Sequence, residues 1–271
     1  GLTFNLLDGL TFKTMLGIQY ENDINNSFTP IIYPDDKGAA ADGYSNTNSV
    51  LNENTLNYKK VFNEKHTVDL LAGFTYQSFN NRYESAAVRG LSSNVTQDYN
   101  IGSASIISPP SNGFSEWKLL SWLGRVNYQY KNKYLLTATF RADGSSKFGA
   151  GNKWGYFPSV AAGWRLSDEA FMQDITFIND LKIRGSYGLT GNDQIGDYQS
   201  LPKIVNTVTY IFDNQLVSGS RQTSLGNADL KWERSGQWDV GLDATIINNR
   251  ISLTFDYYQK TTHDLLFTIN L

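Results

Sequence analysis

The chain has 271 residues, a formal net charge of −3, no cysteine, 14% aromatic residues and 18% charged residues. The small net charge gives nucleic-acid binding no electrostatic support, and the lack of cysteine excludes disulfides, thiolate metal sites and thiol nucleophiles. No run of about 18 apolar residues is present, which excludes a membrane-spanning helix. High aromatic and low charged content suit either a large β-sandwich or a membrane barrel with aromatic girdles.

Nine segments alternate between apolar and polar residues, which is the pattern of a strand with one apolar face and one polar face. In Ser121 to Tyr130, for example, Trp122, Gly124 and Val126 alternate with Arg125. Lys60 breaks the apolar face of its strand. The predicted strands span residues 10–20, 55–62, 66–77, 121–130, 134–142, 160–166, 181–189, 238–246 and 251–257.

The connections between these strands alternate between long and short. Long polar loops are predicted over 21–52, 79–117, 144–155 and 191–234, and short turns over 63–65, 131–133 and 248–249. The segment after residue 166 is of moderate length, and Ser167 to Met172 suits one helical turn with Ser167 as its N-cap. Outer-membrane barrels have short periplasmic turns and long external loops, whereas a sandwich has no reason for this regularity. We therefore expect an all-β, antiparallel, up-and-down transmembrane barrel with the long loops on the cell surface.

Five ordered segments carry a family resemblance. They are FRADGSSKFG, WGYFPSVAAGWRLSDEAFM, LKIRGSYGLTGNDQIGDY, LGNADLKWE and NNRISLTFDYYQKTTHDLL, which begin at residues 140, 154, 181, 225 and 248. The chain resembles the SusC/RagA group of TonB-dependent outer-membrane transporters. This resemblance implies a barrel of about 22 strands closed by a plug domain, location in the bacterial outer membrane, and import driven by TonB. It also implies a SusD-type surface lipoprotein as partner and glycans or peptides as substrates.

The chain shows nothing like a plug or a TonB box. We expect residues 1–271 to be a partial barrel domain whose first and last strands pair with further barrel strands, because an open sheet edge in lipid leaves unpaired backbone groups. Asp264 to Leu271 looks like the start of another strand. Two rival interpretations are a soluble or surface-exposed carbohydrate-binding or adhesin sandwich, and a β-sandwich hydrolase. No acid–base pair or Ser-His-Asp set supports catalysis.

Two groups of residues are candidates for function. Aromatic residues near the external rim stack on sugars or peptides, or anchor the barrel at the membrane interface; they are Trp117, Trp154, Tyr156 and Trp232. Charged residues on the polar faces line the lumen, where their alternative role is to pair with one another or with a plug; they are Arg125, Arg141, Lys182, Arg184, Asp239 and Asp243. Only two histidines exist, far apart in sequence, so no metal site and no cofactor are expected.

Overall fold

The computed structural model describes residues 1–267, apart from the side chains of residues 206 and 207. Nearly all of the regular structure is strand. The elements in chain order are β1 (Leu2–Leu7), β2 (Leu10–Thr29), β3 (Ala39–Phe62), β4 (His66–Arg89), η1 (Ile101–Ser103), β5 (Ile106–Ile107), β6 (Ser111–Tyr130), β7 (Tyr134–Ser145), β8 (Trp154–Arg165), η2 (Leu166–Asp168), η3 (Ala170–Met172), β9 (Ile178–Asn192), β10 (Lys203–Phe212), β11 (Gln215–Ser224), β12 (Glu233–Ile246) and β13 (Ile251–His263).

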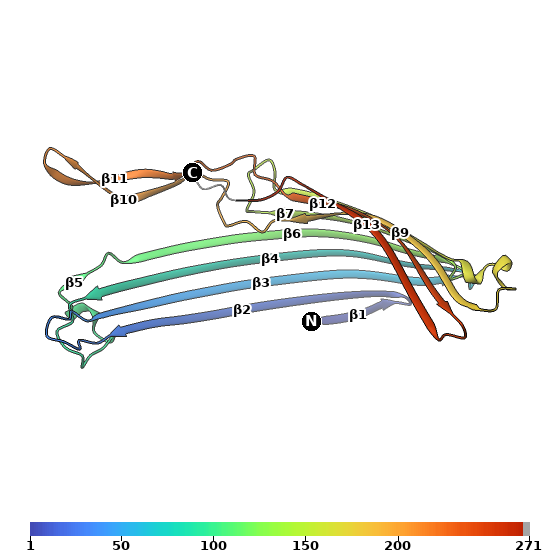
Figure 1. Ribbon diagram of the computed structural model, residues 1–271, viewed down its shortest axis with the longest axis horizontal. Coiled ribbons are helices and arrows are strands. Elements are labelled where there is room, and N and C mark those ends of the chain that lie inside the picture. Colours follow the sequence, from blue (N-terminus) through green and yellow to red (C-terminus); the bar gives the residue numbers. More distant parts are fainter. Residues whose placement is uncertain (268–271) are drawn as a thin grey trace. The chain divides into compact units, whose positions relative to one another are not determined.

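The strands of the main sheet follow one another in chain order as a meander, while β10 and β11 form a separate two-stranded sheet (Figure 1). The sheet order is β1-β2-β3-β4-β6-β7-β8-β9-β12-β13, with β5 paired to β4. The nine predicted strands are all present and share this sheet, whereas a sandwich divides its strands between two packed sheets. β1 was not among the predicted strands, and the β10–β11 hairpin lies within the segment 191–234 that was predicted to be a loop.

The chain divides into two compact units. Unit 1 comprises Gly1–Met15, Asn52–Tyr76 and the described part of Leu119–Leu271, and unit 2 comprises Leu16–Leu51 and Gln77–Lys118.

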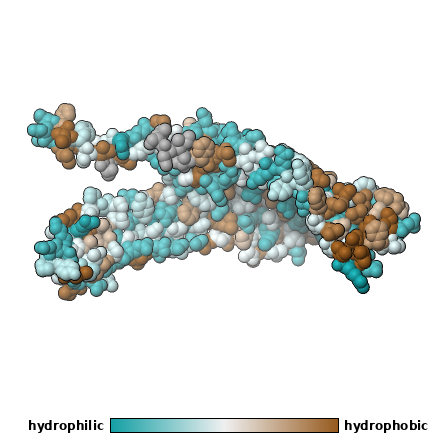
Figure 2. Space-filling view, in the orientation of Figure 1, coloured by the Kyte–Doolittle hydropathy of each residue, from teal (hydrophilic) through white to brown (hydrophobic). Residues whose placement is uncertain are grey.

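In unit 1 the register confirms two distinct faces. Gly124 lies opposite Phe140 and Val126 opposite Ala138, so apolar residues of β6 and β7 share one face. Val240 lies opposite Tyr257 and Gly185, which continues that face across β9, β12 and β13. We call this the outward face, and the opposite side the inward face. In Figure 2 hydrophobic residues gather at the end of unit 1 that carries β13 and the short helical turns.

Short turns join the strands at one end of unit 1, as predicted. Asn63 and Glu64, and likewise Lys131 and Asn132, adopt positive φ, the left-handed conformation that Asn tolerates best. The expected two-residue turn at 248–249 is wrong in length, because β12 ends at Ile246 and β13 begins at Ile251. The N–H of Ile247 donates to the Phe177 carbonyl at 2.8 Å, and the N–H of Arg250 donates to the Ile247 carbonyl at 3.2 Å, which closes the turn.

The predicted loops 21–52 and 79–117 are wrong over much of their length. β2 continues to Thr29, β3 begins at Ala39, β4 continues to Arg89 and β6 begins at Ser111. In unit 2, side-chain hydrogen bonds join these strands: Asn46 donates to Asn22 at 2.7 Å, and Asn81 donates to Thr47 at 2.8 Å. Strands that are polar on both faces lack the apolar alternation by which strands are recognised in sequence.

The remaining connections of unit 2 close over a small apolar cluster. Ala40, Val88, Leu91 and Ala104 are buried there. The Leu91 N–H donates to the Lys37 carbonyl at 2.8 Å, which ties the two connections together. The connections of unit 2 outside the strands are therefore packed around this apolar cluster.

The segment after β8 forms two 3₁₀ turns, η2 and η3, where one helical turn was predicted. Ser167 is not an N-cap; its hydroxyl donates to Asp180 at 3.0 Å instead. Glu169 accepts hydrogen bonds from Tyr134 Oη at 2.8 Å and Trp164 Nε1 at 3.1 Å. This carboxylate fixes the segment to the ends of β7 and β8.

The outermost strands do not pair with each other among the described residues. Phe12 on β2 lies opposite Phe4 on β1, and Phe255 on β13 lies opposite Leu242 on β12. The sheet is therefore open, as predicted. Of the strand expected at Asp264 to Leu271, residues 264–267 are not in a strand and the rest lies outside the described residues.

Candidate functional site in the polar wall and outer rim

Five charged side chains from three adjacent strands meet on the inward face of unit 1. Arg184 Nε lies 3.2 Å from Asp243 Oδ2, and Arg184 Nη1 lies 3.4 Å from Asp239 Oδ1. Arg184 Nη2 also pairs with Asp256, and Lys182 Nζ lies 3.4 Å from Asp243 Oδ2. We call these five residues the Arg184 cluster. Four of them were predicted to face the lumen, and the structure brings those four together.

A glycine allows the Arg184 cluster to cross a whole strand. Gly241 of β12 lies opposite Arg184 on β9 and opposite Asp256 on β13. A Cβ at Gly241 would lie 2.6 Å from both Arg184 Cζ and Asp256 Oδ1. Only a residue without a side chain leaves room for the guanidinium to reach over β12. Gly241 and Asp256 were not predicted as functional residues, although alternation along β13 places Asp256 on the polar face.

Arg141 belongs to a separate group. Its Nε donates to Asp143 at 2.7 Å and 2.8 Å, and its Nη2 donates to Ser121 at 3.0 Å. Asp143 and Ser121 are buried. Arg125 lies opposite Thr139 on the strand pair β6–β7 and is exposed. The six predicted lumen-facing residues thus fall into three groups. Four belong to the Arg184 cluster, Arg141 pairs with Asp143, and Arg125 is exposed.

Trp232 lies in a buried cluster of unit 1. Its side chain is 6% exposed, packs against Phe148 and Phe157, and donates from Nε1 to the Lys153 carbonyl at 2.8 Å. A Cβ at Gly149 would lie 2.2 Å from the Ala228 carbonyl oxygen, so the loop after β7 makes a close backbone contact there. This burial leaves Trp232 little surface for contact with a ligand.

Trp154 and Tyr156 lie on the outward face. They follow the same register as Val160, and the Tyr156 ring stacks on Phe140 with centroids 6.2 Å apart. Both are about half exposed, at 45% and 57%. Exposed aromatic residues on the apolar face of a barrel form the girdle at a membrane interface. Their placement favours the anchoring role over ligand contact.

Trp117 follows the odd-numbered register of β6, as Arg125 does. Within unit 2 its ring stacks on Phe79, with centroids 5.7 Å apart and planes inclined by 15°. A Cβ at Gly113 would lie 2.4 Å from the Tyr83 ring, so Tyr83 lies directly over that glycine. Aromatic rings beside polar Asn81 thus line this side of unit 2, and Phe79 and Tyr83 are additions to the predicted set.

The inward face of unit 1 carries the charged side chains of the Arg184 cluster. Across residues 1–267, no group of three or more histidine and acidic side chains is arranged to hold a metal ion. No helix of the described residues has the length and apolar character needed to cross a membrane. Unit 1 presents both signs of charge in the Arg184 cluster, and unit 2 separately presents the stacked rings of Phe79 and Trp117. Both kinds of group can bind a polar solute.

Comparison with known proteins agrees with this description. A family model described as "TonB dependent receptor-like, beta-barrel" matches residues 1–271. TonB-dependent receptor P3 of Formosa agariphila is 39% identical over 267 residues, which are 97% of this chain and 26% of that protein. TonB-dependent receptor SusC of Bacteroides thetaiotaomicron is 42% identical over 157 residues, which are 56% of this chain and 16% of that protein.

Solved structures give the same result. The structure of the RagAB peptide transporter superposes with a TM-score of 0.89 at 28% identity, covering 99% of this chain and 30% of that one. The chain spans about a quarter of the length of the curated TonB-dependent receptors P3 and P39. Barrels of the outer membrane meet lipid on their outer face and enclose a polar lumen. The chain belongs to the TonB-dependent receptor-like β-barrel family, as a SusC/RagA-type segment of an outer-membrane barrel.

Proposed function

We propose that the protein carrying this chain imports nutrients across the outer membrane with energy supplied through TonB. The match of the family model to all 271 residues supports this proposal most strongly. In this proposal the plug and the TonB box lie elsewhere in the protein, further barrel strands pair with β1 and β13, and a SusD-type lipoprotein works with the barrel. The chain has no catalytic role.

The substrate class is a glycan or a peptide. Likeness to the RagAB peptide transporter over 99% of the chain favours peptides. The Phe79–Trp117 pair offers an aromatic platform to either class, since aromatic faces pack on apolar side chains and on sugar rings. The Arg184 cluster suits a wall of mixed charge that keeps the lumen hydrated and holds the strands together.

Uptake by whole cells tests the proposal. Cells with the full-length protein should take up labelled peptides, and deletion of its gene or a proton uncoupler should abolish that uptake. Glycan oligomers run in parallel distinguish the two substrate classes. Uptake of both classes that persists after deletion and after uncoupling would refute the proposal.

A matched pair of variants tests the inward wall. Trp117→Ala should weaken apparent substrate affinity several-fold, because one stacking partner is lost. Trp154→Ala, on the outward face, should leave affinity unchanged. Equal effects would mean that the two faces are wrongly assigned.

A further inference from the structure

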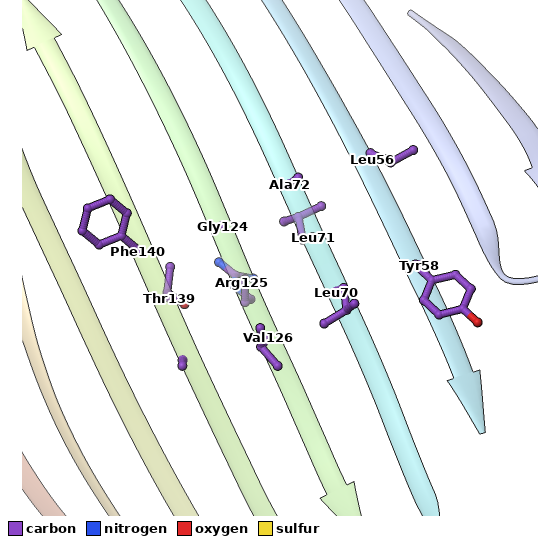
Figure 3. A pocket seen from close by; sticks show the side chains of 11 residues that line it. Leu56, Tyr58, Leu70, Leu71, Ala72, Gly124, Arg125, Val126, Thr139 and Phe140 are labelled. Atoms are coloured by element: carbon purple, nitrogen blue, oxygen red, sulfur yellow. The ribbon is translucent and has the colours of Figure 1, made fainter. Parts of the chain in front are cut away.

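An apolar groove opens on the outward face of unit 1, across β3, β4, β6 and β7 (Figure 3). Its volume is about 620 Å³. Small residues form its floor: Ala72, Gly124 and Ala138. Larger apolar residues stand around them: Leu56, Leu70, Val126 and Phe140.

Small residues form the floor of the groove, and the backbone conformation does not require a glycine there. Gly124 lies opposite Phe140, and its backbone has no positive φ. A Cβ built on Gly124 meets no atom within 4 Å, so neither a turn nor close packing requires glycine there. Glycine inside a strand weakens the strand and often marks a site of close approach by another molecule. The space above Gly124 is open.

A lysine lies near one end of the groove. On β3 the outward series runs Leu56, Tyr58, Lys60, Phe62, and the first two line the groove. Lys60 is the residue that interrupts the apolar face in the sequence. Its side chain is exposed, with Nζ 5.8 Å from the centre of the Phe62 ring.

The position of Lys60 along β3 places it at a membrane interface. It is two residues from Phe62, where β3 ends in a short turn. At the same end of unit 1, Tyr134 stacks between Tyr130 and Trp164, with ring centroids 6.2 Å apart in both pairs. Such a row of aromatic residues marks the boundary of the hydrocarbon layer, and short turns face the periplasm in these barrels. A lysine at this depth extends its ammonium to the lipid phosphates.

We propose that the groove is a binding site for a phospholipid of the periplasmic leaflet, with one acyl chain over Gly124 and the phosphate beside Lys60. The groove is continuous with the lipid-facing band, so hydrocarbon is the molecule available to fill it. An unfilled groove of this kind loses dispersion contacts along its whole lining. This inference depends on the membrane location of the barrel and not on the imported substrate.

Photo-crosslinking tests the site. The full-length protein is reconstituted in phosphatidylethanolamine vesicles with a phosphatidylglycerol that carries a diazirine in mid-chain. After irradiation, crosslinks should concentrate on the segments of β4 and β6 around residues 70–74 and 124–126. Gly124→Leu should lower this crosslinking about tenfold, since the new side chain displaces about two methylene groups.

A second outward glycine provides the control. A Cβ at Gly185 comes no closer than 3.7 Å to the Asp239 carbonyl oxygen, and Gly185 lies outside the groove. Gly185→Leu should leave the crosslinks unchanged. Ala138→Leu fills the groove from β7 and serves as a second variant in case Gly124→Leu does not fold.

The headgroup is tested separately. Lys60→Gln should remove the preference for phosphatidylglycerol over an equivalent phosphatidylcholine probe. Lys131→Gln removes a cation 5.4 Å from the Tyr130 ring at the same rim. This control variant should keep the preference for phosphatidylglycerol.

Three results would overturn the proposal. One is crosslinking spread evenly over the outward face. Another is an equal decrease of crosslinking in Gly124→Leu and Gly185→Leu. The third is a change in oligomeric state on filling the groove, which would assign the groove to contact with a second copy of the protein.

Discussion

Placing an arginine on the outward face of β12 should destabilise the barrel in proportion to its depth in lipid. Val240 is 50% exposed and shares its face with Tyr257. It lies six residues from the end of β12 at Ile246. At about 3.3 Å per residue and a tilt near 40°, this corresponds to a height of roughly 15 Å above the short-turn rim. That height is the middle of a hydrocarbon layer about 30 Å thick.

The expected cost follows from this depth. Val240→Arg should lower the free energy of unfolding by about 2–4 kcal/mol. Leu253 lies only two residues inside the start of β13, so Leu253→Arg at the same face should cost less, near the 1 kcal/mol typical of the interface. Ser186 lies on the inward face, opposite Asp239. Ser186→Arg is therefore the matched control, with an expected change of about 0–1 kcal/mol.

Urea unfolding of the full-length protein in lipid vesicles, followed by tryptophan fluorescence, measures all three variants. The order of destabilisation should be Val240→Arg, then Leu253→Arg, then Ser186→Arg. Equal effects at Val240 and Ser186 would refute the assignment of the two faces.

Three further predictions concern the Arg184 cluster, the topology and the periplasmic rim. Gly241→Ala should lower the urea midpoint, because its Cβ overlaps the ion pair that passes over the strand, whereas Gly185→Ala should change it little; a result in the opposite order would contradict the packing at Gly241. A membrane-impermeant thiol reagent on whole cells should label Gln215→Cys in the external hairpin but not Arg250→Cys in the short turn, and the reverse labelling would invert the topology. Hydrogen bonds from Trp164 and Tyr134 lower the pKa of Glu169 below its ordinary value of 4.5. Its stabilising contribution is thus complete above that pH and lost as the pH falls through the lowered pKa. The difference in urea midpoint between the natural protein and Glu169→Gln should disappear in acid, and a difference that persists there would rule out this role.

The order of the nine predicted strands and the family resemblance could be predicted from the sequence. In unit 1 apolar and polar side chains occupy opposite faces of each strand, so residues such as Trp122 and Arg125 alternate. Short turns had to use residues that tolerate positive φ, as Asn132 does. These are local constraints, and they are visible in any strand taken by itself. For the same reason four residues of the Arg184 cluster could be assigned to one face before the structure was known.

Only the tertiary structure decided which residues on a face meet. Asp256, Gly241 and Arg184 come from three strands, and their contact depends on the register between those strands, which no single strand encodes. Trp232 and Trp154 look alike in sequence, yet loop packing buries one and the strand register exposes the other. The long strands of unit 2 escaped prediction because hydrogen bonds between side chains, such as Asn46 to Asn22, replace the burial of apolar residues as their source of stability. The alternation of apolar and polar residues depends on the environment of each face of a single strand, so it can be recognised in the sequence. Register and loop contacts join chain segments far apart in sequence, so they are visible only in the folded protein.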